Sequence, residues 1–129
     1  MVKKMSRAPQ MPPTLDLDAL ASLRELQETG EPDIVVEIGG LFLEHAPQKL
    51  AAIREAAERE DARGLQMAAH SLKSSSAYVG AIRLSALCKE LEELGRSGSL
   101  EEAAEKVRDL TAEFLRAKAA LKAAMQRSG

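Results

Sequence analysis

The sequence predicts an all-α protein, because its composition favours helices and offers little from which to build a sheet. Ala, Leu, Glu, Lys and Arg, which have high helix propensity, make up a large share of the 129 residues. Aromatic residues are few, with two Phe, one Tyr and no Trp. No run of alternating apolar and polar residues is flanked by hairpin turn signals. We therefore expect helices throughout the folded part of the chain.

The first two predicted helices are marked by capping residues and by apolar side chains at helical spacing. A short helix follows a cap at Thr14 or Asp16 and stops at Gly30. A longer helix opens at Asp33 and continues to about residue 59, and Pro47 inside it should kink or split it. The inward positions are Leu17, Leu20, Leu23 and Leu26, and then Ile34, Ile38, Leu41, Phe42, Leu50 and Ile53.

The third and fourth helices carry equally regular apolar stripes. Asp61 can cap the third, which should end near Gly80, where a left-handed conformation would let the chain turn. The fourth should stop at Gly95 and the Ser97-Gly98 turn. Their inward positions are Leu65, Ala68, Ala69, Leu72, Ser76 and Val79, and then Leu84, Leu87, Cys88, Leu91 and Leu94.

The last helix begins with Ser99 and Glu102 at the spacing of a capping box. Its apolar stripe is Leu100, Ala103, Val107, Leu110, Phe114, Ala117 and Leu121. Short loops join the four long helices, and short loops favour antiparallel neighbours. The expected architecture is an up-down-up-down antiparallel four-helix bundle with an additional short N-terminal helix.

The length and charge of the chain limit its number of domains and the classes of function that it can have. The chain suits one domain, over residues 14–127, preceded by a flexible Pro-rich arm or linker at residues 1–13. Eighteen basic and twenty acidic residues give a net charge of −2, which argues against tight nucleic-acid binding. No apolar stretch is long enough for a membrane span or a signal peptide. A single cysteine excludes an internal disulfide framework.

His70 is the residue that most suggests chemistry. At about 100° per residue it lies roughly 200° from Leu72, so it faces solvent if Leu72 faces the core. An exposed neutral imidazole is a competent nucleophile near neutral pH, and a cation one turn away can neutralise a phosphoryl group. Geometry alone leaves an ordinary exposed histidine as the simpler interpretation. The residues that share its face are Met67, Lys73, Ser74 and Ala77.

The sequence around His70 closely resembles the signature of histidine-containing phosphotransfer (HPt) domains. The resemblance rests on Ala69-His70-Ser71-Leu72-Lys73, the small residues that follow to Ala77, Gly80-Ala81, and the downstream Leu91-Glu92. Upstream, Leu41-Phe42-Leu43-Glu44 with Pro47 and Leu50 matches the family's usual approach to its histidine. About residues 15 to 125 are covered. Many members have Gly where this chain has Ser74, a change that adds one hydroxymethyl group beside the ring.

The resemblance implies a carrier that accepts a phosphoryl group from the aspartyl phosphate of one receiver domain and passes it to the aspartate of another. His70 would be the phospho-acceptor and Lys73 its electrostatic partner. Met67, Ser74 and Ala77 would form the docking and clearance face, and Gly80 would end the helix. No bound cofactor is expected, since the receiver brings its own Mg²⁺, and we expect no autonomous kinase or ATPase activity.

We expect the domain to be cytoplasmic. It would be either the terminal domain of a membrane-bound hybrid sensor kinase or a free-standing carrier. The Pro-rich start favours the hybrid kinase slightly. The partners would be response-regulator receiver domains. We expect no nucleic-acid binding, no direct membrane contact by this domain, and a monomer in isolation.

Other interpretations remain open from the sequence. A non-transferring helical docking module could keep the fold without the chemistry. A helix-turn-helix over residues 74–86 has too few cations for DNA, and a metal site that includes His45 and His70 would require distant segments to converge. Asp16 and Asp18 suit a helix N-terminus, and Cys88 suits the core. A solvated acidic face is the simplest interpretation of Glu90, Glu92, Glu93, Glu101 and Glu102.

Overall fold

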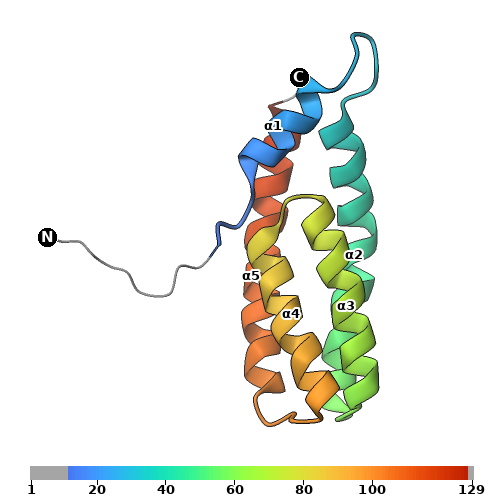
Figure 1. Cartoon of the computed structure of the whole chain (residues 1–129), viewed down its shortest axis with the longest axis vertical. Helices are drawn as coiled ribbons and strands as arrows, with labels where there is room; N and C mark the ends of the chain where they lie inside the picture. Colours follow the sequence, from blue (N-terminus) through green and yellow to red (C-terminus); the bar gives the residue numbers. More distant parts are fainter. Residues whose placement is uncertain (1–11, 128–129) are drawn as a thin grey trace, which may run out of the picture.

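The computed structural model describes residues 12–127, which form five α-helices (Figure 1). No strand occurs in this part of the chain, so the all-α prediction is confirmed. Most of the predicted arm at residues 1–13 lies outside the described residues. The helices are α1 (Leu17–Glu25), α2 (Ile34–Glu58), α3 (Ala62–Tyr78), α4 (Ile82–Ser97) and α5 (Ala103–Gln126).

The four long helices pack side by side in a closed ring. α3 packs against α2 and α4, and α5 packs against α2 and α4. In the view of Figure 1, α3 and α4 lie in front of α5 and α2. α1 contacts α2, and the side chain of Arg24 ties it to α5 by donating to the carbonyl of Ala124 at 2.9 Å. The ring therefore has an α3–α4 side and, opposite it, an α2–α5 side.

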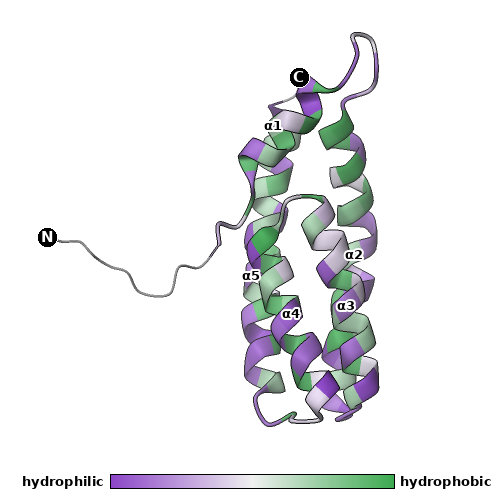
Figure 2. Cartoon of the chain, in the orientation of Figure 1, coloured by the Kyte–Doolittle hydropathy of each residue, from purple (hydrophilic) through white to green (hydrophobic). Residues whose placement is uncertain are grey.

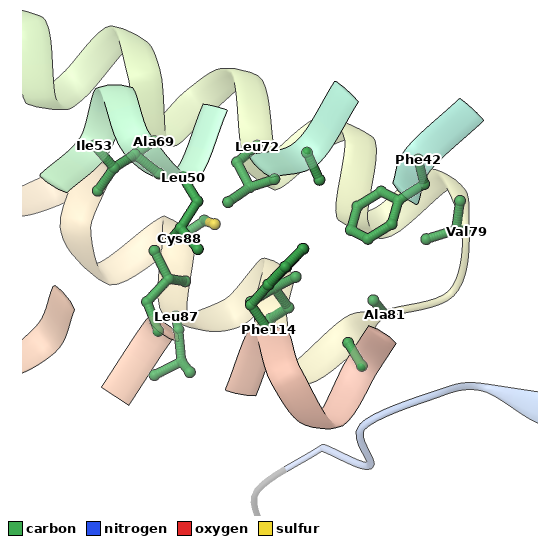
Figure 3. Packing of buried hydrophobic residues seen from close by; sticks show 14 of the residues in the cluster. Phe42, Leu50, Ile53, Ala69, Leu72, Val79, Ala81, Leu87, Cys88 and Phe114 are labelled. Carbon is green, nitrogen blue, oxygen red and sulfur yellow. The ribbon is translucent and has the colours of Figure 1, made fainter. Parts of the chain in front are cut away.

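The core runs the length of the ring, and buried residues from all five helices contribute to it. Figure 3 shows part of this core, around Phe42, Leu72, Cys88 and Phe114. Phe42 and Phe114 meet in it with ring centroids 6.2 Å apart. Polar residues cover the outer faces, as Figure 2 shows.

Most predicted inward positions are buried or partly buried. Leu17 and Leu26 are wrong, at 52% and 81% exposed, and Leu26 lies beyond α1, which ends at Glu25 and not at Gly30. Leu41 is also wrong, at 58% exposed. Its neighbour Phe42 takes the inward position, and adjacent helical residues point about 100° apart.

Aspartates begin three of the helices, as the sequence predicts. Asp16 accepts from the amide of Ala19 at 3.0 Å, Asp33 from that of Val35 at 2.9 Å, and Asp61 from that of Gly64 at 2.9 Å. Each carboxylate satisfies a donor that the first helical turn leaves unpaired. These caps fix where α1, α2 and α3 start.

Pro47 and Gly95, where the sequence suggested an interruption, both lie inside continuous helices. α2 continues through Pro47, because a proline removes one backbone hydrogen bond and the packing of a 25-residue helix outweighs it. α4 continues through Gly95 and ends at Ser97, before Gly98 in the left-handed region at φ 78°, so the predicted Ser97-Gly98 turn is confirmed and the stop at Gly95 is wrong. Gly95 instead allows close packing, since a Cβ there would lie 2.6 Å from the amide nitrogen of Gln66 on α3.

The predicted capping box at the start of α5 is also wrong. The amide of Ala103 donates to the carbonyl of Leu100 at 3.1 Å, so a turn precedes the helix. Ser99 then stands four residues before the first helical residue, too far away to cap it. No side-chain hydrogen bond caps this end of α5.

The segment before α1 is bound to the α3–α4 turn. Arg83 donates from its backbone amide to the carbonyl of Pro13 at 3.2 Å and from Nε to that of Pro12 at 2.7 Å. The amide of Asp16 donates to the carbonyl of Gly80 at 2.8 Å. Gly80 has φ 79°, which confirms the left-handed conformation predicted for it. The end of α3 is therefore fixed by contacts from a distant segment.

Candidate functional site

α3 holds His70 on the exposed edge between α3 and α4. Leu65, Ala69, Leu72 and Ser76 form the buried side of this helix. The side chain of His70 is 60% exposed, so the predicted orientation is confirmed. The ring is accessible to a macromolecule while its backbone is held in a packed helix.

A buried carboxylate from α4 holds the imidazole. Oε2 of Glu92 lies 2.8 Å from Nδ1 of His70, and Oε1 accepts from Nζ of Lys73 at 2.5 Å. A guanidinium nitrogen of Arg96 lies 3.8 Å from Oε2. The side chain of Glu92 is only 8% exposed. One carboxylate therefore joins the histidine, the lysine and the arginine.

This position of Glu92 corrects the sequence interpretation, which placed it on a solvated face. Glu92 lies four residues after the buried Cys88 and three before the buried Gly95, so it belongs to the face of α4 that packs on α3. That spacing was visible in the sequence, but Glu92 stands among other acidic residues and was interpreted with them as exposed. Glu90 pairs with Lys106 of α5 at 2.6 Å, and Glu93, Glu101 and Glu102 are exposed as predicted.

The hydrogen bond from Lys73 lowers the pKa of Glu92 below its ordinary value of 4.5. Burial of the carboxylate acts in the opposite direction, and the hydrogen bond from His70 lowers the pKa further. Glu92 is therefore ionised at neutral pH and can only accept hydrogen bonds. Nδ1 of His70 must then carry the proton in the contact. In a neutral ring with that tautomer, Nε2 keeps its lone pair.

Lys73 lies near the ring, as the sequence indicates, but it contacts Glu92 and not the imidazole. Its side chain is 29% exposed. The carbonyl oxygen of Lys73 also accepts from Oγ of Ser85 on α4 at 3.1 Å, so α3 and α4 are bonded at this level through both side chain and backbone. The lysine holds the carboxylate that holds the histidine.

An apolar groove between α2 and α3 continues the His70 face. Ser74 and Ala77 are exposed, and so is Met67, at 59%. The adjoining groove has a volume of about 680 Å³, and Leu41 and Tyr78, 58% and 71% exposed, line it. The groove also takes in Ser74, Ser75, His45 and Lys49, and Nζ of Lys49 donates to Oγ of Ser75 at 2.6 Å.

Sequence reasoning missed two of these groove residues. It assigned Leu41 to the core and gave Tyr78 no part in the site. Leu41 adjoins Phe42 and points about 100° away from it on the helix, and the packing of α2 turns Phe42 to the core and Leu41 to the groove.

The other candidates have ordinary structural roles. Cys88 is fully buried, and burial raises the pKa of its thiol to about 12, so it stays protonated. His45 is exposed on α2. Within residues 12–127, no group of three or more His, Cys, Asp or Glu side chains could hold a metal ion. Nor does any helix in that range have the length and apolar character that crossing a bilayer requires.

Curated proteins with similar sequences include histidine-containing phosphotransfer proteins of Arabidopsis thaliana. Protein 2 is 33% identical over 79 residues, which cover 59% of this chain and 51% of that protein. Protein 4 is 32% identical over 81 residues, which cover 61% of this chain and 64% of that protein. The aligned region thus spans about half to two thirds of the length of these relatives.

Solved structures share the fold over nearly the whole chain. Histidine-containing phosphotransfer protein B from Pseudomonas aeruginosa PAO1 superposes with a TM-score of 0.80 at 34% identity, covering 89% of this chain and 96% of that one. A histidine-containing phosphotransfer protein from Medicago truncatula gives a TM-score of 0.76 at 28% identity, covering 89% and 80%. The family model described as Hpt domain matches residues 37–127, the greater part of the sequence. This chain therefore belongs to the Hpt domain family.

Proposed function

We propose that this chain is a histidine phosphotransfer module of a two-component phosphorelay, in which His70 accepts a phosphoryl group from a receiver aspartyl phosphate and passes it to the aspartate of another receiver. The observation that carries the proposal is the contact between the exposed imidazole and the buried, ionised Glu92. That contact fixes the ring and directs the Nε2 lone pair outward. Family membership supports the same conclusion.

Transfer needs one bond to form and one to break. The Nε2 lone pair of His70 attacks phosphorus, the bond from phosphorus to the aspartate oxygen breaks, and the carboxylate leaves with the electron pair. The product ring keeps its Nδ1 proton and carries a positive charge, which the carboxylate of Glu92 neutralises at 2.8 Å. The second transfer is the same exchange in reverse, onto another aspartate.

The cations around Glu92 have separate contributions in this proposal. Lys73 fixes the carboxylate and offsets its charge, so an incoming phosphoryl group does not meet an uncompensated anion. Arg96 is 58% exposed in its side chain and lies at the rim of the cluster. Mg²⁺ would come with the receiver's acidic pocket, and no bound cofactor is proposed for this chain.

We propose that receivers dock on the face formed by Met67, Ser74 and Ala77 together with Leu41 and Tyr78. These residues are exposed around the His70 edge, and three of them are large apolar side chains. Exposed apolar side chains beside a reactive group suit a protein partner. Ser74 in place of the more common Gly narrows this face by one hydroxymethyl group.

The wider setting follows the same proposal. The domain would comprise residues 14–127 and form an up-down-up-down antiparallel four-helix bundle with an additional short N-terminal helix. It would act in the cytoplasm as a monomer. It would be either a free carrier or part of a hybrid kinase. We propose no contact with nucleic acid or with a membrane. The ring of helix contacts supports the four-helix bundle, and the net charge of −2 supports the absence of nucleic-acid binding.

A non-transferring docking module is the alternative. It would use the same groove between α2 and α3 but would have no chemical need for a lysine, a carboxylate and a histidine bonded together. The arrangement of Glu92 therefore favours transfer.

The test is phosphotransfer from a receiver domain charged with a small phosphodonor and Mg²⁺ to the wild-type chain, to His70→Gln and to His45→Gln. We expect acid-labile, base-stable label on the wild type and on His45→Gln, and none on His70→Gln. His45 is the control because it is the other histidine; since it lines the groove between α2 and α3, the readout for this variant is the presence of label and not the rate of labelling. If several receivers bind the folded chain but leave no label on it, the transfer proposal is wrong and the docking module is the better interpretation.

A further inference from the structure

A second apolar groove lies between α2 and α5, on the side of the ring opposite the His70 edge. It has a volume of about 550 Å³. Val107 lies in its floor and Leu115, 61% exposed, on its wall. Three alanines and a threonine supply the rest of its largely small-residue surface. Neither phosphoryl transfer nor receiver docking on α2 and α3 makes use of this groove.

The charges around this groove are distinctive. Arg54 of α2 and Arg108 of α5 line it, together with a single acid, Glu58. Within the described part of the chain, neither arginine has an ion pair or a hydrogen bond through its side chain. The groove therefore has one excess positive charge on a chain whose net charge is −2. Unpaired arginines beside an apolar floor are typical of surfaces that recognise acidic partners.

We propose that the α2–α5 groove binds an acidic amphipathic helix of another protein. Its apolar residues, spaced i, i+3/i+4 and i+7, would cover Leu115 and Val107, and its flanking carboxylates would pair with Arg54 and Arg108. A groove between two adjacent helices suits the ridge of a third helix, and small floor residues allow a close approach.

Charge argues against a second copy of this chain as the occupant. A two-fold contact would place this groove against itself and bring the arginines of both copies together with only one acid each to offset them. An acidic helix supplies the missing charge. Because the groove and the His70 edge lie on opposite sides, the helix and a receiver can bind at the same time, so the helix would hold the carrier near its partners without blocking transfer.

The test uses two fluorescent peptides and no phosphoryl donor, so its result is independent of the proposed function. Both are helical 18-residue peptides with the same leucine ridge; glutamates flank the ridge in one and lysines in the other. We expect the acidic peptide to bind with amide NMR shifts confined to α2 and α5, and the basic peptide to bind at least about tenfold more weakly. The double variant Arg54→Glu with Arg108→Glu should reverse that preference.

A charge-matched control is Arg63→Glu with Arg127→Glu, which changes the net charge equally at two exposed positions outside the groove. It should keep the preference for the acidic peptide. Leu115→Glu, at an exposed position that tolerates a polar side chain in the fold, should remove binding. Equal affinity for both peptides, shifts on α2 and α3 instead, or no binding would overturn the proposal. If the wild type forms a concentration-dependent dimer and the double variant does not, the occupant of the groove is a second copy of this chain and the proposal is overturned.

Discussion

Glu92 of α4 and Glu113 of α5 are both buried glutamates, but their side chains contact different kinds of residue. Both oxygens of Glu92 have partners, and one partner is the exposed His70. Glu113 is fully buried, its Oε1 accepts from Nε of Arg116 at 2.9 Å, and its Oε2 has no hydrogen-bond partner. Burial and ion pairing are common to both. Only Glu92 contacts an exposed imidazole.

The surroundings of Glu113 indicate a structural role. Arg83 lies 3.8 Å from its Oε1 and is itself held by the carbonyls of Pro12 and Pro13. The carboxylate thus sits beneath a contact between α4, α5 and the segment before α1. Replacing each glutamate by the isosteric glutamine should therefore change different properties of the protein.

The largest effect is expected for Glu92→Gln. The amide oxygen would face Lys73, so the amide NH₂ would donate to Nδ1 of His70 and leave the proton on Nε2, where the lone pair is needed. The rate of phosphoryl acceptance should fall about 100-fold, as for other groups that orient a reacting side chain. Rates from a charged receiver measure the effect, and the imidazole ¹⁵N shifts report the tautomer. Unchanged shifts with an unchanged rate would show that the carboxylate does not orient the ring.

A somewhat smaller effect is expected for Gly95→Ala, which tests whether close packing of α3 and α4 places Glu92. The added Cβ would lie 2.6 Å from the amide of Gln66 and 2.7 Å from the carbonyl of Ala62, so the helices must separate. We expect the free energy of unfolding to fall by about 2 kcal/mol, and transfer to slow as Glu92 moves.

Gly40→Ala is the matched control, since a Cβ there meets nothing within 4 Å and the helix should gain up to about 1 kcal/mol. Urea unfolding of both variants measures the difference. A Gly95→Ala variant as stable as the wild type would contradict the packing argument.

Glu113→Gln should have the opposite profile to Glu92→Gln. Loss of the charge weakens the hydrogen bond from Arg116 and the ion pair with Arg83, so the free energy of unfolding should fall by about 1 kcal/mol. The phosphotransfer rate should stay within about twofold of the wild type, because this carboxylate does not contact His70. Urea unfolding and transfer rates, taken on the same preparation, separate the two effects. A large loss of transfer would remove the distinction drawn between the two glutamates.

The smallest effect is a pH dependence of stability. Hydrogen bonds from Lys73 and His70 keep the pKa of folded Glu92 below 4.5, its ordinary value in an unfolded chain. The resulting stabilisation is present above pH 4.5 and is lost as the pH falls through the lower, folded pKa. The wild type should therefore lose more stability below pH 4.5 than Glu92→Gln does. Glu93→Gln, on the exposed side of the same helix, controls for net charge; equal slopes for all three would refute the assignment.

Local signals predicted the helices and one side of the site well. The aspartate caps at Asp16, Asp33 and Asp61 were readable because capping involves residues two or three positions apart. The failures came where tertiary packing outweighed a local rule. Pro47 did not interrupt α2, and Gly95 served close packing of two helices where the sequence indicated a stop.

The sequence by itself determined that the chain is helical and that His70 is exposed, because a period of 3.6 residues links the exposure of His70 to the burial of Leu72 on the same helix. Only the tertiary structure decided which groups surround the ring. Glu92 is 22 residues away along the chain, and its contact depends on how closely α4 approaches α3 and how it is rotated. The groove from Leu41 to Tyr78 likewise depends on which sides of α2 and α3 meet. Helical periodicity orients a residue on its own helix, whereas contacts between helices depend on how the helices pack.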